Sequence, residues 1–326
     1  MNPIVTSSTS ASLLVLICLG GCSSDNEDSG IQELDLTRVY REPPNGGEQW
    51  LVPDMTLEPF SEEIFCYYGT HQGETVGVNY LQPFMSSHNH HAFIQATDRN
   101  DRPDGTLELC TSVGGMEQTS PLFEFTGTSF TSDGNYLALP EQSAIKLKEG
   151  QQWVIEAHFI NPTPDRIIVN AAFNLGFVPV ESVERWTASW QFDIGDLLLP
   201  AGQESSLDFQ CGFPTEVSLL TLTGHMHEFG RRHEVDLIHS EGENRIYTVE
   251  DWIPEYRDYP PLSSWEPDEL RITPDESLSI GCSWENTEQE DLVFPQEMCT
   301  AKGLILDTED AIFCVNGTQM GQDESQ

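Results

Sequence analysis

Gln152-Trp-Val-Ile-Glu-Ala-His-Phe159 is the stretch that decides the fold, because it is rich in β-branched and aromatic residues and lies between clusters of turn residues. Three more runs of this kind follow: Arg166-Ile-Ile-Val-Asn-Ala-Ala-Phe173, Ser218-Leu-Leu-Thr-Leu-Thr223 and Ser277-Leu-Ser-Ile280. Almost no segment has the helical period. Short strands at this spacing are typical of antiparallel sandwiches. The sequence therefore predicts an all-β protein.

The length of the chain predicts two domains, since 326 residues at roughly 150 residues per domain give about two. Hydrophobic residues make up 38% of the chain and aromatic residues 10%, which is enough for two cores and excludes a disordered chain. The stretch Phe177-Val-Pro-Val-Glu-Ser-Val-Glu184 follows one cluster of strands and precedes another. We expect an N-terminal domain over 46–180, a C-terminal domain over 181–316 and a tail over 317–326.

The net charge excludes one class of partner. The chain has 14 Lys and Arg residues against 54 Asp and Glu residues, a formal charge of −40. It has no basic surface that would neutralise phosphates, so nucleic acid is not an expected partner. The same charge repels anionic lipid, so we expect contact with a membrane only through a lipid anchor.

The N-terminal segment predicts export. The first 21 residues contain no charged side chain and include the apolar run Leu13-Leu-Val-Leu-Ile-Cys-Leu19, which is typical of a signal peptide. Leu19-Gly-Gly-Cys22 resembles a bacterial lipobox, which implies that Cys22 carries lipid after cleavage. We expect a signal peptide over 1–21, an acidic tether over 22–45 and a lipid-anchored location in the bacterial cell envelope, on its periplasmic face or surface. The first basic residue is only Arg38, and ordinary cleavage near the same position is the alternative.

The cysteines predict disulfide bonds. Cys18 leaves with the signal peptide and Cys22 is the expected lipid site, so six of the eight cysteines remain: Cys66, Cys110, Cys211, Cys282, Cys299 and Cys314. An even number in an exported chain implies disulfides, although six cysteines allow about fifteen pairing schemes. No Cys-x-x-Cys motif is present, which excludes zinc-ribbon and thioredoxin-like motifs.

Five of the nine histidines lie in two short groups, His88-Asn-His-His91 and His225-Met-His227. Residues two apart on a strand point to the same face, so His225 and His227 can reach one metal ion. The alternative is two surface histidines on an edge strand. His90 and His91 would point to opposite faces of a regular strand, so joint ligation needs a kink or different ring nitrogens. His88 and His90 are therefore a rival pair.

Two further candidates are weak by themselves. His158 lies within an apolar strand, where a single histidine is more often a hydrogen-bonded core residue than a ligand. Met298 lies in Gln296-Glu-Met-Cys299, where core packing is the ordinary role of a methionine.

Taken together, these motifs resemble the type II copper, ascorbate-dependent monooxygenases, the family of peptidylglycine alpha-hydroxylating monooxygenase and dopamine beta-monooxygenase. The similarity extends over roughly residues 50–315. It depends on the order of five elements: His90-His91, Glu156-Ala-His-Phe-Ile-Asn-Pro162, Leu199-Pro-Ala-Gly202, His225-Met-His-Glu-Phe-Gly230 and Glu297-Met-Cys299. Each element is unspecific alone, and the combination is specific.

The resemblance implies two jelly-roll-like sandwiches in tandem with two copper ions per chain. His90, His91 and His158 would hold an electron-transfer copper that is reduced by ascorbate. His225, His227 and Met298 would hold the catalytic copper, and a thioether ligand favours copper over zinc. The resemblance also implies disulfides that pair Cys66 with Cys110, Cys211 with Cys314 and Cys282 with Cys299.

The substrate is not implied. Peptide-hydroxylating members have an Arg where this chain has Thr223 and a Tyr where it has Lys302. If the segment after Met298 continues as a strand, Lys302 lies on the ligand's face and is a candidate for binding an anionic substrate group. The alternative is an ordinary surface lysine.

We expect a monomeric monooxygenase that acts on a small molecule or peptide with dioxygen. An exported copper-binding lipoprotein without turnover and a structural adhesion module are the alternatives. Copper binding without turnover would favour the first of these, and no copper binding at all would favour the second.

Overall fold

The computed structural model describes residues 42–97, 100, 102–110, 124–125, 136–257, 260–294 and 296–320. The expected signal peptide, the lipid site Cys22 and most of the tether lie outside these residues. Within them the regular elements are strands, apart from two short 3-10 turns at Val180–Ser182 and Pro254–Arg257. The prediction of an all-β fold is confirmed.

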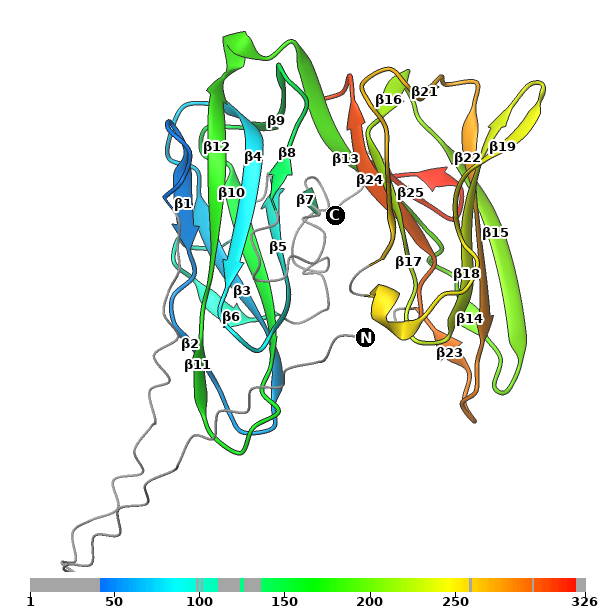
Figure 1. Cartoon of the computed structure of the whole chain (residues 1–326), viewed down its shortest axis with the longest axis horizontal. Coiled ribbons are helices and arrows are strands. Elements are labelled where there is room, and N and C mark those ends of the chain that lie inside the picture. The colour runs from blue at the N-terminus through cyan, green and yellow to red at the C-terminus, as the bar shows by residue number, and fades with distance from the viewer. Residues whose placement is uncertain are drawn as a thin grey trace, which may run out of the picture. The chain divides into compact units, whose positions relative to one another are not determined.

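In the described part of the chain twelve strands precede the turn at residue 180 and fourteen follow it. Figure 1 labels most of them. The first set is β1 Glu48–Leu51, β2 Met55–Leu57, β3 Glu62–Thr70, β4 Val76–Met85, β5 Asn89–Thr97, β6 Leu107–Leu109, β7 Glu124–Phe125, β8 Leu137–Ala138, β9 Ser143–Leu147, β10 Gln152–Ile160, β11 Ile167–Val169 and β12 Ala171–Pro179. The second set is β13 Arg185–Asp193, β14 Leu198–Leu199, β15 Glu204–Gly212, β16 Val217–Leu219, β17 Thr221–His225, β18 Gly230–His239, β19 Gly242–Val249, β20 Leu262–Ser264, β21 Arg271–Ile272, β22 Ser277–Glu285, β23 Leu292–Val293, β24 Thr300–Leu306, β25 Ile312–Val315 and β26 Thr318–Gln319.

The first set forms a sandwich around β10. One sheet has the order β6-β3-β10-β5-β7, and the opposing strands run β1-β12-β4-β9. Strand β10 is buried along its length except for its last residue, Ile160. Trp153, Ile155 and Phe159 pack into the main core with residues of β1, β4, β9 and β12. Because successive side chains alternate between faces, Val154 and His158 point to the other side of the sheet.

The second set forms another sandwich. One sheet has the order β15-β22-β18-β19, and it packs against β13 and its neighbours β24 and β25. Strand β22 shows strict alternation between buried and partly exposed residues, as expected where one face meets the core. Trp190 and Trp284 are among the largest fully buried side chains and come from opposite sheets. Neighbouring strands are antiparallel, except that β13 pairs in parallel with β9 and β25.

The turn at Val180–Ser182 lies where the sequence places the domain boundary. Most core residues before it belong to one hydrophobic cluster, and most of those after it belong to another. Leu220, Leu304 and Leu306 pack into the first cluster although they belong to the second set of strands. The division at 180 and 181 therefore stays a prediction.

The described residues contain three disulfides, and their pairings confirm the scheme that the resemblance implies: Cys66 with Cys110, Cys211 with Cys314 and Cys282 with Cys299. Disulfides persist in oxidising compartments, so they are consistent with an exported protein. Among the residues described, no helix has the length and apolar character required to cross a bilayer.

Candidate metal centres

The first candidate centre lies at the end of β17, where the ring nitrogens of two histidines face each other. His225 is the last residue of the strand, and its Nε2 atom lies 3.2 Å from Nε2 of His227. The two rings are nearly perpendicular, at 84°. The expected convergence of these two imidazoles is therefore present, on a strand end rather than within a strand.

The hydrogen bonds of each ring leave the facing nitrogens available. Nδ1 of His227 lies 3.0 Å from the backbone oxygen of Gln296, which can only accept. The proton of His227 is therefore on Nδ1, and Nε2 presents a lone pair. His225 also hydrogen-bonds the backbone of Arg257, and desolvation is the main cause that holds its pKa well below 6.5. The positive charges of Lys302, the next largest cause, and of Arg257 lower the pKa of His225 further.

If the hydrogen bond of His225 to the Arg257 backbone uses Nδ1, Nε2 of His225 presents a lone pair as well, and two lone pairs 3.2 Å apart repel unless a cation lies between them. Two metal–nitrogen bonds of about 2.0 Å at a tetrahedral angle would separate the nitrogens by about 3.3 Å. The observed 3.2 Å fits that value. The donor set therefore suits a metal ion, which would be held by Nε2 of His225 and of His227.

The Met298 segment lies beside this pair. The backbone N–H groups of His227 and Met298 both donate to Oε1 of Glu297, at 2.5 and 2.9 Å. Met298 is 9% exposed, and its neighbour Cys299 is fixed by the disulfide to Cys282 on β22. Burial raises the pKa of the Glu297 carboxyl above 4.5, and the hydrogen bonds that it accepts act in the opposite direction. The structure thus brings the Met298 backbone to His227, as the resemblance implies.

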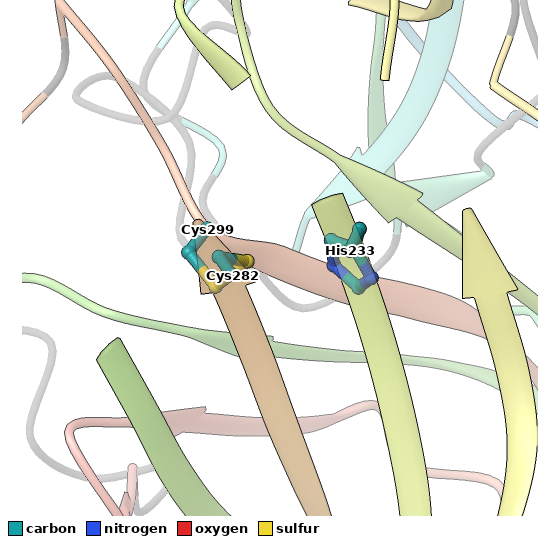
Figure 2. Close-up of side chains that lie close together, drawn as sticks. All are labelled: His233, Cys282 and Cys299. Carbon is teal, nitrogen blue, oxygen red and sulfur yellow. A yellow bond between two sulfur atoms is a disulfide. The ribbon is translucent and has the colours of Figure 1, made fainter. Parts of the chain in front are cut away.

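Another cluster near this centre is not a metal site. Figure 2 shows His233, Cys282 and Cys299, whose side-chain ligand atoms lie within 4.8 Å of one another. The two sulfurs are bonded to each other and are not available as thiolates. Nε2 of His233 instead donates to the backbone oxygen of Thr300 at 2.8 Å.

His233 supports the strand that carries His225. A Cβ atom added at Gly224 would lie 2.7 Å from three atoms of the His233 ring, so the ring packs directly against that backbone. Thr300, which accepts the hydrogen bond from His233, pairs with His225 across β17 and β24. His233 is fully buried, and its ring therefore fixes the backbone behind the first candidate centre.

His233 should make stability depend on pH. Desolvation lowers its pKa from 6.5 to about 4. Between these pH values His233 binds a proton in the unfolded chain but not in the folded protein. The contribution of neutral His233 to the free energy of unfolding is therefore fully present above pH 6.5 and is lost as the pH falls to 4. The shift corresponds to about 3 kcal/mol.

Urea unfolding at several pH values would measure this decline, and His233→Gln, which keeps a donor for Thr300, should remove it. His239→Gln, on a partly exposed position of β18, should retain it. Equal slopes for the wild type and His233→Gln between pH 6.5 and 4 would contradict the assignment.

The second candidate centre lies on β5 and β10. Nδ1 of His90 lies 3.0 Å from Nδ1 of His158, and Nε2 of His158 lies 2.8 Å from a carboxylate oxygen of Glu62. Because the Glu62 carboxylate accepts a hydrogen bond, Nε2 of His158 keeps the proton and Nδ1 faces His90. His158 is 3% exposed and carries both interactions, so its geometry suits a metal ligand and a hydrogen-bonded core histidine alike.

A bulge on β5 provides the irregularity that ligation by His90 and His91 requires. His91 pairs with His158 and Asn89 pairs with Phe159, so His90 is an extra residue between two regular pairs. A bulge breaks the strict alternation of side-chain directions. His88 lies in the preceding turn at a φ of 66°, and its Nδ1 atom is 3.1 Å from Oγ of Ser87. The position of the His91 side chain lies outside what the structure describes.

Lys302 and Thr223 lie opposite each other on β24 and β17. The condition set for Lys302, a strand that continues directly from Met298, is not met, because β24 begins at Thr300. Lys302 shares a face with His225 for another reason, the register that pairs Thr223 with Lys302 and His225 with Thr300. Thr223 is 5% exposed, and its hydroxyl donates to the backbone oxygen of Pro261 at 2.9 Å.

Sequence reasoning missed Glu62, Glu297 and His233. Glu62 is separated from His158 by 96 residues, and nothing in its local sequence marks it as a partner. Glu297 directly precedes Met298, and its proximity to a candidate ligand was the only available signal. His233 follows the His-x-His motif by six residues on the next strand.

No family model and no curated protein matches the chain. Among solved structures, PNGase F, a glycosylasparaginase from Flavobacterium meningosepticum, has a TM-score of 0.36 and 10% identity over 82% of this chain and 98% of that one. A peptide-N(4)-(N-acetyl-beta-D-glucosaminyl) asparagine amidase has a TM-score of 0.34 and 9% identity over 80% and 97%. The PBCV-1 protein VP54 has a TM-score of 0.28 and 7% identity over 82% and 95%. Likenesses this distant carry no argument about function.

Proposed function

We propose that the protein is a copper-dependent monooxygenase that hydroxylates an activated C–H bond, using dioxygen and a reductant such as ascorbate. The observation that carries the proposal is the presence of two separate pairs of imidazole nitrogens, 3.2 and 3.0 Å apart, on two sandwiches. The pair of His225 and His227 lies beside the Met298 segment. In the other pair, His90 is followed in sequence by His91. This arrangement is the one that the resemblance to type II copper monooxygenases implies.

Each residue has a defined task in this proposal. His225 and His227, through Nε2, and Met298 would hold the catalytic copper. His90 and His158, through Nδ1, and His91 would hold the electron-transfer copper. The Gln296 carbonyl and the Glu62 carboxylate keep the proton of His227 and of His158 on the nitrogen that does not face the metal.

Bound copper supplies one-electron redox chemistry and the capacity to activate dioxygen. One oxygen atom enters the substrate as a hydroxyl group. The other leaves as water, with two electrons from the reductant and two protons. The chain's own contribution is to hold the imidazoles in a neutral, fixed tautomer, and the lowered pKa of His225 serves this requirement.

Lys302 is proposed to bind an anionic group of the substrate. It shares a sheet face with His225, and its charge acts on that ring. Nζ lies 5.6 Å from the centre of the Phe93 ring. Thr223 is not proposed to bind the substrate, because its hydroxyl already donates a hydrogen bond to the backbone oxygen of Pro261.

Lys302→Met keeps the aliphatic stem and removes the charge. For an anionic substrate we expect the apparent KM to rise by a factor that corresponds to about 1.5 to 3 kcal/mol, with copper content unchanged. Steady-state kinetics with that substrate and with a neutral analogue would measure it. If Lys302→Met leaves the KM for the anionic substrate unchanged, Lys302 is an ordinary surface lysine and does not bind the substrate.

The proposed location is the bacterial cell envelope, with Cys22 as the lipid attachment site. The protein would act there as a monomer on a small molecule or peptide. No nucleic acid is involved, because the chain carries a charge of −40.

The test is oxygen transfer. Copper-loaded protein with ascorbate under ¹⁸O₂ would be screened against mixtures of small molecules and peptides for products that gain one heavy oxygen atom. Labelled product that depends on copper supports the proposal. Two bound copper ions without labelled product across a broad screen would favour a copper-binding lipoprotein, and no copper binding would overturn both.

A further inference from the structure

Glu297 is a buried carboxylate that joins the two segments of the catalytic site. Its side chain is fully buried, and it accepts hydrogen bonds from three backbone N–H groups. Oε1 accepts from His227 at 2.5 Å and from Met298 at 2.9 Å, and Oε2 accepts from Phe229 at 3.0 Å. Both proposed ligand segments are therefore bonded to one side chain.

These contacts have a specific energetic consequence. A buried carboxylate is costly unless its oxygens are satisfied, and hydrogen bonds to a charged acceptor are stronger than neutral ones. Here the donors belong to the loop after β17 and to the segment before β24, about 70 residues apart in sequence. Glu297 can be satisfied only when the two segments are adjacent, so the carboxylate selects the conformation in which His227 and Met298 lie side by side.

Other contacts fix the remaining freedom of the loop. The Gln296 carbonyl orients the His227 ring at 3.0 Å, and the indole N–H of Trp252 donates to the His227 carbonyl at 3.1 Å. Cys299 is anchored to Cys282. None of these contacts joins the backbone of His227 to that of Met298, and Glu297 alone among them does so.

We propose that Glu297 is a positioning residue that assembles the His225, His227 and Met298 site before the metal binds. This inference rests on the proposed function for the identity of the ligands and goes beyond it by assigning a role to a residue that does not contact the metal. Its consequence is that the soft thioether is presented to copper without a cost of loop ordering.

The test uses full-length copper protein with Glu297→Gln and Glu297→Asp. Glutamine keeps the shape but presents an amide donor to one of the three N–H groups, and aspartate shortens the reach by one methylene. We expect retention of the catalytic copper to weaken about 10- to 100-fold, as is usual when an outer-shell partner of a metal site is removed. Copper at His90 and His158 should be unaffected.

The sulfur contribution to the X-ray absorption spectrum of the Cu(I) form should decrease in the Glu297 variants, an effect that simple destabilisation does not produce. Glu285→Gln is the matched control, because Glu285 is a half-exposed carboxylate that pairs with Arg231. It should retain both copper ions and the sulfur signal. An unchanged sulfur signal and affinity in both Glu297 variants would overturn the inference.

A second measurement on the wild type covers the case in which the variants do not fold. In the copper-free protein the amide protons of His227, Phe229 and Met298 should exchange slowly with solvent. Fast exchange of these amides would refute assembly before metal binding. Failure of the wild type to bind copper at this centre would instead refute the proposed function and leave the amide result standing.

Discussion

His91→Ala is expected to abolish retention of the electron-transfer copper, while His88→Asn should spare it. The reason is the bulge on β5, which places His90 as the extra residue between His91 and Asn89. His90 already faces His158 through Nδ1, and His91 is the residue paired with His158 across the strands. Loss of a direct ligand should weaken binding by at least about 100-fold, the upper range for outer-shell partners.

Asparagine is the suitable replacement for His88, because that residue has a φ of 66° and asparagine tolerates the left-handed region. Copper content after dialysis, together with the paramagnetic resonance signal of the Cu(II) form, would measure both variants. Loss of the electron-transfer copper in His88→Asn with its retention in His91→Ala would reverse the assignment and leave only His90 and His158 secure.

Met298→Ile is expected to remove Cu(I) from the catalytic centre and leave the other centre intact. The side chains have similar volumes, so the cost in stability should stay below about 1.5 kcal/mol. The thioether is the only soft ligand among the six proposed, and soft ligands favour Cu(I). We therefore expect about two copper ions per wild-type chain and about one per variant chain under reducing conditions, with oxygen-dependent turnover lost.

A Cu(I) chelator competition at fixed ascorbate would measure this loss. Met298→Leu serves as a second apolar variant that controls for the β-branched shape of isoleucine, and both should behave alike. Two copper ions retained in either variant would exclude Met298 as a ligand.

The strand pattern could be predicted from the sequence where burial is regular. Strand β22 alternates at every position, and the β10 stretch is bounded by turn residues. The start of β24 at Thr300 could not be predicted, because the residues before it are held by long-range hydrogen bonds of Glu297 and Gln296 to His227. The residues around Met298 in sequence do not indicate partners that lie about 70 residues away.

The candidate site was predictable in part. The spacing of His225 and His227 indicates convergence by itself. The adjacent pair His90 and His91 does not, because a bulge depends on the pairing of β5 with β10. Glu62 and His233 contribute through contacts across 96 and 67 residues, which no local pattern reveals. The disulfide pairings likewise came from the resemblance and not from spacing.

The paired state of the cysteines bears on how well the proposed monooxygenase would resist oxidative damage. Ascorbate, copper and oxygen together generate oxidants, and thiolates are the first groups that these attack. Among the described residues all six cysteines are already in disulfides, so this part of the chain offers no thiol. Beside the proposed catalytic centre two thioethers remain, Met226, which is fully buried, and Met298, which is 9% exposed. At this centre, oxidative damage would begin with sulfoxide formation at Met298, so the ligand would be lost before the protein unfolds.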